Sequence, residues 1–350
     1  MADKPNIRSF PLEELIKMFT EKGEKAFRAK QVYEWLWKKN VRTFDEMTNL
    51  SKDLRKFLEE NFSIPHIKIK HFQRSNDGTI KNAVTLPDNL LVESVLIPTE
   101  TRTTACVSSQ VGCSLDCKFC ATARLKRMRN LTPDEIVDQV VEADLQSKEY
   151  YGHPLSNIVF MGMGEPLLNY ENVMSAIEKI TSDKALGMSP KRITVSTSGI
   201  PKMIKKMADE NPKVKLAVSL HSAIDEIRTQ IMPVNKRQGG LQELLYALQY
   251  WYKKTKSRIT FEYLVFKNIN DDEKSIKALV NFVKQVPSKV NLIEYNPIDN
   301  KDTFCQADNE ILEKYQLALK NAGVVSTIRR SRGKDIDAAC GQLAGKMIRE

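Results

Sequence analysis

The sequence contains no long apolar run, and nothing in it approaches the roughly 18 consecutive apolar residues of a membrane-spanning helix. Its first residues, MADKPNIRSFPLEEL, lack the apolar core of an export signal. We therefore expect a cytoplasmic protein with no membrane partner. Internal repeats and low-complexity segments are absent too. With 350 residues, 41% of them hydrophobic and 28% charged, the chain can bury a sizeable core.

Histidine is scarce: the chain has 4 histidines, and none of them flanks the densest group of cysteines. That group, CSLDCKFC, contains Cys113, Cys117 and Cys120. Cytosolic thiols stay reduced, so clustered cysteines favour metal or redox chemistry over disulfides. A structural zinc site closes its shell with four ligands, and the loop offers neither a histidine nor a second C-x-x-C pair. Three thiolates on an iron–sulfur cubane instead leave one iron open, which is useful where a cofactor or substrate must bind it.

Acidic residues are outnumbered by basic ones, which gives a net charge of +10 and a pI near 9.1. Such an excess suggests a polyanionic partner, with nucleic acid as the first candidate. Two groups of cations lie close to cysteines in the chain: Arg124, Lys126, Arg127 and Arg129, then Arg329, Arg330, Arg332 and Lys334. We expect both groups to contact RNA phosphates, and the alternative is a merely solvated charged face.

The first part of the chain has helical periodicity. Between residues 9 and 62, apolar residues recur at helical spacing, starting at Leu12 behind Ser9 as a possible N-cap. Thr43 and Glu46 form a capping-box pattern. Between residues 66 and 98 the period changes to two, which predicts a hairpin closed at Asp77-Gly78 and then the strand LLVESVLIP.

From about residue 102, apolar runs alternate with helical patterns. The runs TACVSS, NIVFM, RITVS, VKLAVSL, TFEYLVF, VNLIEY and VVSTI predict about six βα units and a closing strand. Six units are fewer than the eight of a complete barrel, so the fold class we expect is α/β, with a partial (β/α)6 barrel. We expect four parts: a helical accessory module with an RNA-binding role (1–65), a β-hairpin extension (66–98), the barrel (99–330) and a C-terminal segment that carries Cys340 (331–350).

Polar residues gather where the predicted strands end, which is where parallel barrels form their active sites. NIVFM runs into GMGEP, which contains Gly164 and Glu165. The next strands end near Ser196, near Ser219 and His221, and near Asn296. Each piece alone has an ordinary structural reading, such as a turn or a core histidine. Together they predict a rim that binds a polar cofactor.

Several longer motifs resemble those of a known protein family. The cysteine spacing and the Gly-Glu-Pro element look like the radical S-adenosylmethionine superfamily. ACVSSQVGCSLDCKFCATA, NIVFMGMGEPLLN, VSTSGI, VSLHSA, NLIEYNP and DIDAACGQL more closely resemble the RlmN family of RNA adenine-C2 methyltransferases. The resemblance implies that Cys113, Cys117 and Cys120 bind a [4Fe-4S] cluster whose open iron chelates S-adenosylmethionine. The positions that match the family's cofactor contacts are Gly164, Glu165, Ser196, Ser219, Leu220, His221 and Asn296.

The same resemblance assigns three further residues. Cys340 matches the thiol that becomes S-methylcysteine, using one of two S-adenosylmethionine molecules per turnover. Cys106 matches the thiol that resolves the RNA adduct through a transient disulfide with Cys340, and Glu93 matches the proton acceptor. Without the family, both thiols read equally well as buried structural cysteines. Glu93 could also be the solvent face of a strand, whereas burial would make it a better base. Cys305 matches no motif, and we interpret it as structural.

The family's substrates are an adenosine in the peptidyl-transferase region of 23S rRNA and the adenosine 3′ of the tRNA anticodon, with an electron donor such as flavodoxin. The nearest alternative is a Cfr-type enzyme that methylates C8 of the same rRNA adenine. Pro166 favours C2, because the Cfr pattern usually has alanine there. A radical enzyme acting on a small molecule is a more distant alternative. A non-catalytic RNA-binding protein with a structural metal is the alternative from another class.

Overall fold

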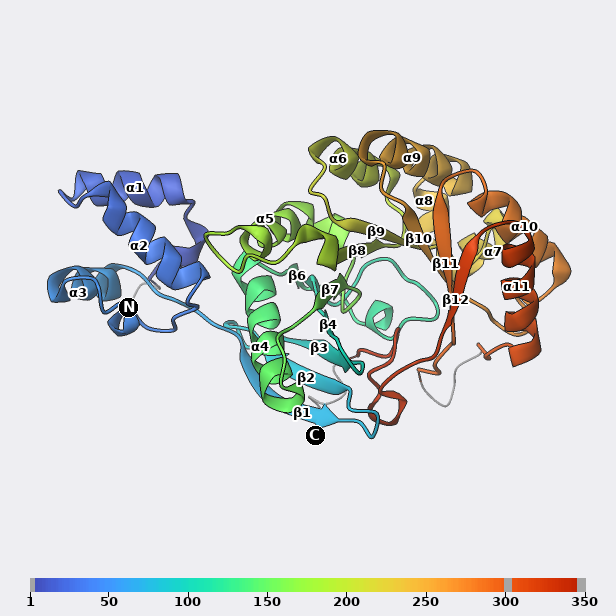
Figure 1. Cartoon of the computed structure of the whole chain (residues 1–350), viewed down its shortest axis with the longest axis horizontal. Helices are drawn as coiled ribbons and strands as arrows, with labels where there is room; N and C mark the ends of the chain where they lie inside the picture. The colour runs from blue at the N-terminus through green and yellow to red at the C-terminus, as the bar shows by residue number, and fades with distance from the viewer. Residues whose placement is uncertain (1–3, 299–303, 345–350) are drawn as a thin grey trace.

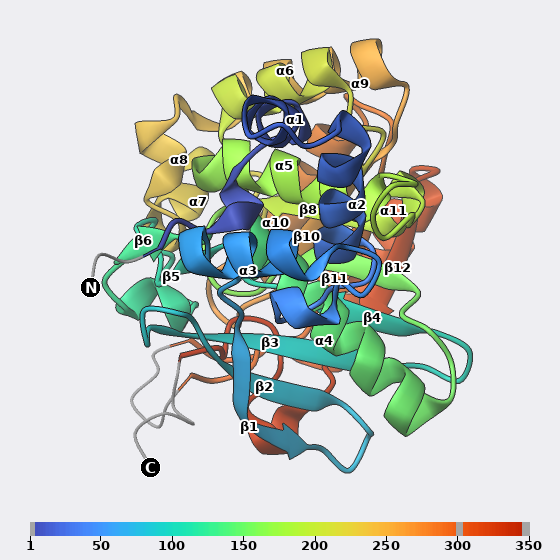
Figure 2. The same ribbon diagram turned by 90° about the vertical axis from the view of Figure 1, so that its left-hand side faces the viewer.

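The N-terminal part of the computed structural model, which describes residues 4–298 and 304–344, is a small group of helices beside the main body of the protein. Figure 2 views this group in front of the barrel. Its helices are η1 (Ile7–Ser9), α1 (Leu12–Glu21), α2 (Ala26–Trp37), η2 (Phe44–Glu46) and α3 (Lys52–Asn61). The predicted helices are therefore confirmed.

The sequence predicted two of these helix starts from local signals, and the structure confirms one of them but not the other. The capping box of Thr43 and Glu46 forms, although it begins the short helix η2. Ser9 is not the N-cap of α1, because that position is occupied by Pro11. The Ser9 hydroxyl instead donates to the carbonyl of Asn6.

The predicted hairpin forms from β1 (Lys68–Arg74) and β2 (Ile80–Thr85), which pair antiparallel. Gly78 in the connecting turn has φ +86°, a conformation that glycine adopts without strain. β3 (Leu91–Pro98) extends the hairpin, and it pairs antiparallel with both β2 and the next strand. The hairpin is thus continuous with the main sheet.

Ten strands form one sheet within the described residues, in the order β1-β2-β3-β4-β7-β8-β9-β10-β11-β12. From β4 onward each neighbouring pair is parallel. These parallel strands are β4 (Thr103–Cys106), β7 (Asn157–Phe160), β8 (Ile193–Thr197), β9 (Lys215–Ser219), β10 (Ile259–Leu264), β11 (Ser288–Ile293) and β12 (Val325–Arg329). β1 and β12 are the two edges and do not pair with each other. The sheet curves but stays open, which confirms the partial barrel.

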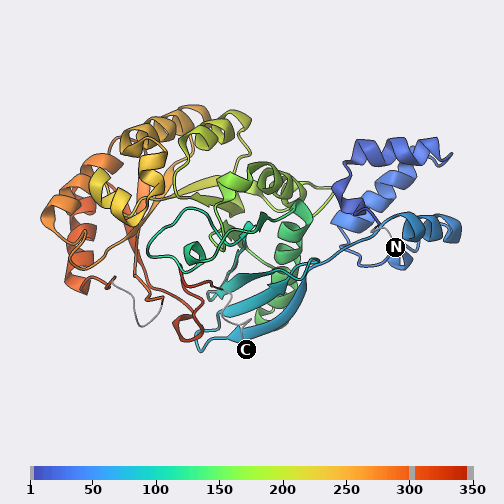
Figure 3. The ribbon, with the colours of Figure 1, turned by 180° about the vertical axis from the view of Figure 1, so that it is seen from behind.

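Helices cover the outer side of this curved sheet (Figures 1 and 3). They are α4 (Pro133–Tyr151), α5 (Tyr170–Thr181), α6 (Pro201–Glu210), α7 (Asp225–Ile231), α8 (Val234–Arg237), α9 (Gly240–Thr255), α10 (Glu273–Val283) and α11 (Asn309–Asn321). α4 starts as the sequence indicates, with Pro133 in its first turn and a capping box between Thr132 and Glu135. None of the helices in the described residues is both long enough and apolar enough to cross a membrane.

The loop that follows β4 lies on the inner side of the curve. It contains β5 (Gln110–Val111), η3 (Thr122–Arg124) and β6 (Arg129–Asn130). The last described residues, beyond η6 (Lys334–Ile336), pass next to this loop, since the backbone N–H of Ala121 donates to the carbonyl of Gly341 at 2.7 Å. The four-part division of the chain remains a prediction, and residues 1–3, 299–303 and 345–350 of those parts lie outside the described residues.

Candidate active site

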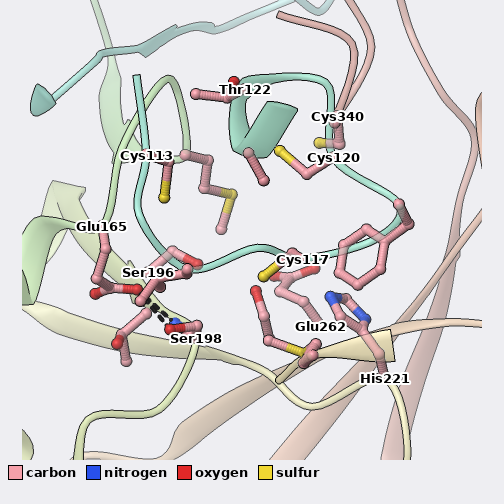
Figure 4. A pocket seen from close by; sticks show the side chains of 18 of the residues that line it. Cys113, Cys117, Cys120, Thr122, Glu165, Ser196, Ser198, His221, Glu262 and Cys340 are labelled. Carbon is pink, nitrogen blue, oxygen red and sulfur yellow. Dashed lines mark hydrogen bonds between the residues drawn. The ribbon is translucent and has the colours of Figure 1, made fainter. Parts of the chain in front are cut away.

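The three clustered cysteines line a cavity at the inner rim of the barrel, with an empty volume of about 1000 Å³ including its open mouth. Figure 4 shows the side chains of Cys113, Cys117 and Cys120 on different sides of this space. In the described parts of the chain, no three His, Cys, Asp or Glu side chains are grouped closely enough to hold a single metal ion. Thiols spread around a cavity suit a cubane, in which each thiolate binds a different iron.

The electrostatics of these thiols also fit a metal cluster. Burial raises the pKa of Cys113 to about 11 and raises the pKa of Cys117 as well, and the thiolates would repel one another. Three thiolates can therefore coexist here only if positive charge enters the cavity. Iron supplies that charge, because coordination deprotonates a thiol. The residues present thus fit a [4Fe-4S] cluster bound by three cysteines.

The GMGEP turn after β7 packs tightly against the start of the cysteine loop. Gly164 has φ +96°, and a Cβ at this position would lie 2.5 Å from the Cβ of Gln110. The Gln110 side chain also accepts a hydrogen bond from the backbone N–H of Glu165 at 2.9 Å. Glycine is therefore required at position 164 both by its backbone conformation and by the close approach of the loop.

The Glu165 carboxylate connects the ends of two strands. One oxygen accepts from the backbone N–H of Leu167 at 3.0 Å, and the other accepts from the N–H and hydroxyl of Ser198, both at 2.8 Å. Burial raises the pKa of Glu165, and these hydrogen bonds oppose the rise. The carboxylate lines the cavity while it holds the β7 and β8 loops together (Figure 4).

His221 is buried at the end of β9 and is held in a defined orientation. Its Nδ1 accepts from the backbone N–H of Leu264 at 3.0 Å, and its ring meets Phe119 edge to face at a centroid distance of 4.8 Å. Burial lowers its pKa to about 3, and the charge of Arg228 adds to this effect. The ring is therefore neutral at physiological pH, and because Nδ1 accepts, Nε2 carries the proton.

Arg228 is a residue of this rim that the sequence reasoning missed. It is buried, and its guanidinium donates to the carbonyls of Ser198 at 2.6 Å and Ser219 at 3.1 Å. It also donates to the carbonyl of Leu220 at 3.1 Å and to the side chain of Asn235 at 2.6 Å. One side chain thus ties the ends of β8 and β9 together. The only signal in the sequence was an arginine on an apolar helix face.

Of the remaining predicted cofactor contacts, two line the cavity and two do not. Ser196 and Ser219 line the cavity. Leu220 is fully buried and meets the rim through its backbone, whose N–H donates to the carbonyl of Glu262. Asn296 does not line the cavity, and its amide donates to the hydroxyl of Ser331 at 2.9 Å. Its side chain therefore holds the chain that leads to Cys340.

A second cavity adjoins the first and contains Cys106. Both cavities share lining residues, including Cys120, Arg329 and Cys340. Burial raises the pKa of Cys106 to about 12 and also raises the pKa of Cys340, whereas the Arg329 guanidinium attracts both thiolates and opposes the rise. The structure thus brings together two cysteines that lie 234 positions apart in the sequence. Cys305 is exposed and lines neither cavity, and its interpretation as structural stays a prediction.

Glu93 is fully buried on β3, so the interpretation as a solvent-facing strand residue is wrong. Its carboxylate lies 3.2 Å from the ammonium of Lys81, which is also buried. Val95, two residues along the same face of β3, lines the second cavity and pairs in register with Cys106. Glu93 therefore lies on the side of the sheet that faces the two thiols.

Several cations expected to bind RNA are paired within the protein. Arg129 makes hydrogen bonds to both oxygens of Glu135, at 2.8 and 2.7 Å, and these bonds raise its pKa. Arg330 and Lys334 both bind Glu294, and although burial opposes them, their hydrogen bonds lower the pKa of Glu294 to about 2. These three cations stabilise the fold, so they are less available to RNA than the sequence suggested. Arg124, Lys126, Arg127 and Arg332 have exposed side chains.

A curved parallel sheet with three thiols around a cavity at its rim defines a radical S-adenosylmethionine enzyme. Residues 107–280 match the Radical SAM superfamily, and residues 5–64 match the Ribosomal RNA large subunit methyltransferase N-terminal domain. A relative in Flavobacterium johnsoniae, named probable dual-specificity RNA methyltransferase RlmN, is 64% identical over 98% of each chain. The protein of the same name in Christiangramia forsetii is 65% identical over 98% of this chain and 97% of that one.

A solved structure agrees with these relatives. The crystal structure of a radical SAM methyltransferase from Sphaerobacter thermophilus has a TM-score of 0.91 and 36% identity, and the match covers 98% of this chain and 100% of that chain. The chain described here belongs to the RlmN family. It is accordingly a radical SAM methyltransferase, and this membership implies a [4Fe-4S] cluster and S-adenosylmethionine as cofactors.

Proposed function

We propose that this enzyme methylates C2 of adenine in RNA, acting in the cytoplasm on 23S rRNA in the peptidyl-transferase region and on the adenosine 3′ of the tRNA anticodon. Relatives named as dual-specificity RNA methyltransferases support an RNA substrate, as does the N-terminal match to a ribosomal RNA methyltransferase domain. Pro166 supports C2 over C8. The observation that carries the proposal is that Cys340 lines both cavities, one with the cluster cysteines and one with Cys106.

Cys113, Cys117 and Cys120 would hold the [4Fe-4S] cluster, and S-adenosylmethionine would bind beside it along the rim formed by Glu165, Ser196, Ser219 and His221. When bound, the cluster and S-adenosylmethionine supply the carbon radical chemistry that an electron-poor aromatic carbon requires. The neutral Nε2–H of His221 is suited to donate a hydrogen bond to bound cofactor. The Glu165 carboxylate can accept one from its amine. Two molecules of S-adenosylmethionine are consumed per turnover, and a donor such as flavodoxin supplies the electron.

Cys340 carries the methyl group that becomes the new carbon on the base. Once this carbon is bonded to C2, a thioether joins Cys340 to the RNA. Glu93 accepts the proton that leaves C2, and the one electron that must also leave to restore the aromatic ring would return to the iron–sulfur cluster. The Cys106 thiol then gives up its proton and attacks the sulfur of Cys340, and an equivalent proton is taken up by the released carbon. The S–S bond forms, the S–C bond breaks, and the electron pair stays on carbon, which takes a proton to become the methyl group. Arg329 supports this step because its charge stabilises the attacking Cys106 thiolate.

RNA must reach these two cavities with its adenine unstacked. Exposed cations next to the cysteine loop (Arg124, Lys126 and Arg127) and near Cys340 (Arg332) would contact the phosphates of the bound RNA. The N-terminal helices offer a further surface for RNA. Both features support a polynucleotide over a small-molecule substrate.

The test is anaerobic reconstitution of the cluster, followed by incubation with S-adenosylmethionine, a reductant and either 23S rRNA or tRNA, and mass spectrometry of the nucleosides. We expect 2-methyladenosine in both RNAs. Detection of 8-methyladenosine alone would support the Cfr-type alternative. Absence of any modified nucleoside, together with zinc in place of iron, would support the non-catalytic RNA-binding alternative.

The resolving thiol has its own test. Cys106→Ala should accumulate a covalent RNA–protein adduct through Cys340, visible as a shifted band that nuclease treatment removes. Cys305→Ala is the matched control, because that thiol is exposed and lines neither cavity. Normal turnover by Cys106→Ala without an adduct would refute the resolving role.

A further inference from the structure

A buried ion pair lies beneath the segment that carries Cys340. Lys81 on β2 and Glu93 on β3 are 1% and 0% exposed, and the ammonium and carboxylate lie 3.2 Å apart. The register pairs Lys81 with Val95 and Glu93 with Ala83, so the two charged side chains are diagonal neighbours on one face of the sheet. The opposite face of β2 packs on α4, since Asn82 exchanges hydrogen bonds with Gln146 at 2.8 and 2.9 Å.

Both members of the pair also contact the C-terminal segment, on opposite sides of Cys340. The Lys81 ammonium makes a long hydrogen bond of 3.5 Å to the carbonyl of Ile336. The Glu93 carboxylate accepts from the backbone N–H of Ala344 at 2.9 Å. Ile336 and Ala344 lie four residues before and four residues after Cys340. The ion pair thus holds the segment Ile336–Ala344 at both ends, with the thiol in the middle.

An ion pair is an unusual way to hold two strands together at such a site. Desolvation makes a buried pair no better for stability than well-packed apolar side chains, so stability alone gives no reason for charge here. A charged pair differs from an apolar one because its contacts depend on a proton. If Glu93 becomes neutral, its attraction to Lys81 falls, and the hydrogen bond from Ala344 loses its charge assistance.

We propose that Lys81 is a positioning residue that, through Glu93, holds the segment Ile336–Ala344 in place, so that proton uptake by Glu93 releases Cys340. This inference rests on the proposed function, in which Glu93 takes the proton from adenine C2. In this step the C2–H bond breaks, an O–H bond forms on the Glu93 carboxylate, and the C–H electron pair stays in the adenine ring, while the unpaired electron of the adduct would pass to the cluster. The segment then loosens after carbon transfer, which lets Cys340, a residue that lines both cavities, move away from the cluster cavity during the attack by Cys106.

The test is hydrogen–deuterium exchange of the reconstituted holoenzyme without RNA, read on peptides that cover residues 336–344. Glu93→Gln imitates the protonated carboxyl, and Lys81→Met removes its partner. Loss of one charge-assisted hydrogen bond should speed local exchange by about tenfold or more. Lys81→Arg keeps the charge and should restore most of the protection. The rate at which iodoacetamide alkylates Cys340 provides a second readout and should rise in the same two variants.

The matched control is Asn82→Ala, on the same strand and equally buried but facing α4. It should speed exchange in α4 and leave residues 336–344 unchanged. If Lys81→Met lowers thermal stability but leaves exchange of 336–344 at the parent rate, Lys81 is only structural and the inference fails. Should Lys81→Met not fold, Glu93→Gln, which keeps the shape of the side chain, decides the same question.

Failure of this inference and failure of the proposed function have different signatures. If Glu93→Gln still forms 2-methyladenosine at the parent rate, Glu93 is not the proton acceptor, and the positioning role is judged on the exchange data for Lys81→Met alone. If Glu93→Gln loses methylation while residues 336–344 stay protected from exchange in every variant, Glu93 remains the proton acceptor and the positioning role of Lys81 is overturned.

Discussion

Replacement of Arg228 by methionine should be among the most damaging single changes at the barrel rim. The buried guanidinium donates to four acceptors, on Ser198, Ser219, Leu220 and Asn235, at 2.6 to 3.1 Å. Methionine has a similar length but donates no hydrogen bond, so these acceptors lose their partner. Each buried acceptor left unpaired costs about 1–3 kcal/mol. After local relaxation and water entry, we expect a loss of about 3–5 kcal/mol in the free energy of unfolding.

Differential scanning calorimetry under anaerobic conditions can measure this effect. For a chain of this size, each kcal/mol shifts Tm by about 1.4 °C, so Tm should fall by roughly 4–7 °C. The affinity for S-adenosylmethionine, measured by isothermal titration, should fall as well, because the carbonyls that Arg228 holds lie at the ends of β8 and β9. Arg228→Lys keeps the charge but not the planar fork, and it should recover only part of both losses.

Arg237→Met is the matched control for this prediction. The Arg237 side chain is 49% exposed, donates to the carbonyl of Leu115 at 3.0 Å and lies 3.6 Å from the Asp116 carboxylate. Contacts of this exposed kind contribute about 1 kcal/mol or less. If Arg228→Met costs no more than Arg237→Met, the reasoning from buried hydrogen bonds is refuted.

Two further predictions follow from the same rim. Burial lowers the pKa of His221 from its usual 6.5 to about 3. Between pH 6.5 and pH 3, His221 is therefore protonated in the unfolded chain but neutral in the native chain. This group should therefore cost about 2 kcal/mol of stability at pH 5 relative to pH 8, and His221→Gln should remove that part of the pH dependence in urea unfolding. An unchanged pH dependence would contradict this. Gly164→Ala should lower the free energy of unfolding by about 1–3 kcal/mol through backbone strain at φ +96°, and its Cβ should also displace the turn from Gln110. Gly187→Ala is the control, because this glycine has φ +67° but open space around it, so only the backbone strain should appear. Equal Tm values for the two glycine variants would show that the contact with Gln110 is unimportant.

The parts of the fold that follow from local pattern could be read from the sequence. The alternation of apolar runs with helical segments predicted the parallel strands and the open barrel, because each βα unit is encoded within a few tens of residues. The capping boxes at Thr43 and Thr132 were readable for the same reason. The N-cap of α1 was not, because Ser9 satisfies its own hydroxyl in a preceding turn.

Electrostatic partners were much harder to read from the sequence. Arg129 looked available to RNA, yet it binds Asp88 and Glu135, of which Asp88 lies in the turn between β2 and β3. Lys81 lies on β2 in the sequence IKNAVT, and a lysine in a strand is more often exposed than buried. Both faces of β2 are covered, by α4 on one side and by the Cys340 segment on the other. A period of two reveals that a strand has two faces but not what packs against each.

The sequence by itself determined the cluster loop, because Cys113, Cys117 and Cys120 lie within one short stretch. Their spacing along the chain does not depend on how the rest of the chain folds. Only the tertiary structure decided that Cys106 and Cys340 share a cavity, and that Lys81 and Glu93 lie beneath the segment carrying Cys340. Such contacts depend on how far an open sheet curves and where the end of the chain returns to it. Both are set by packing among residues distant in sequence, which no local pattern records.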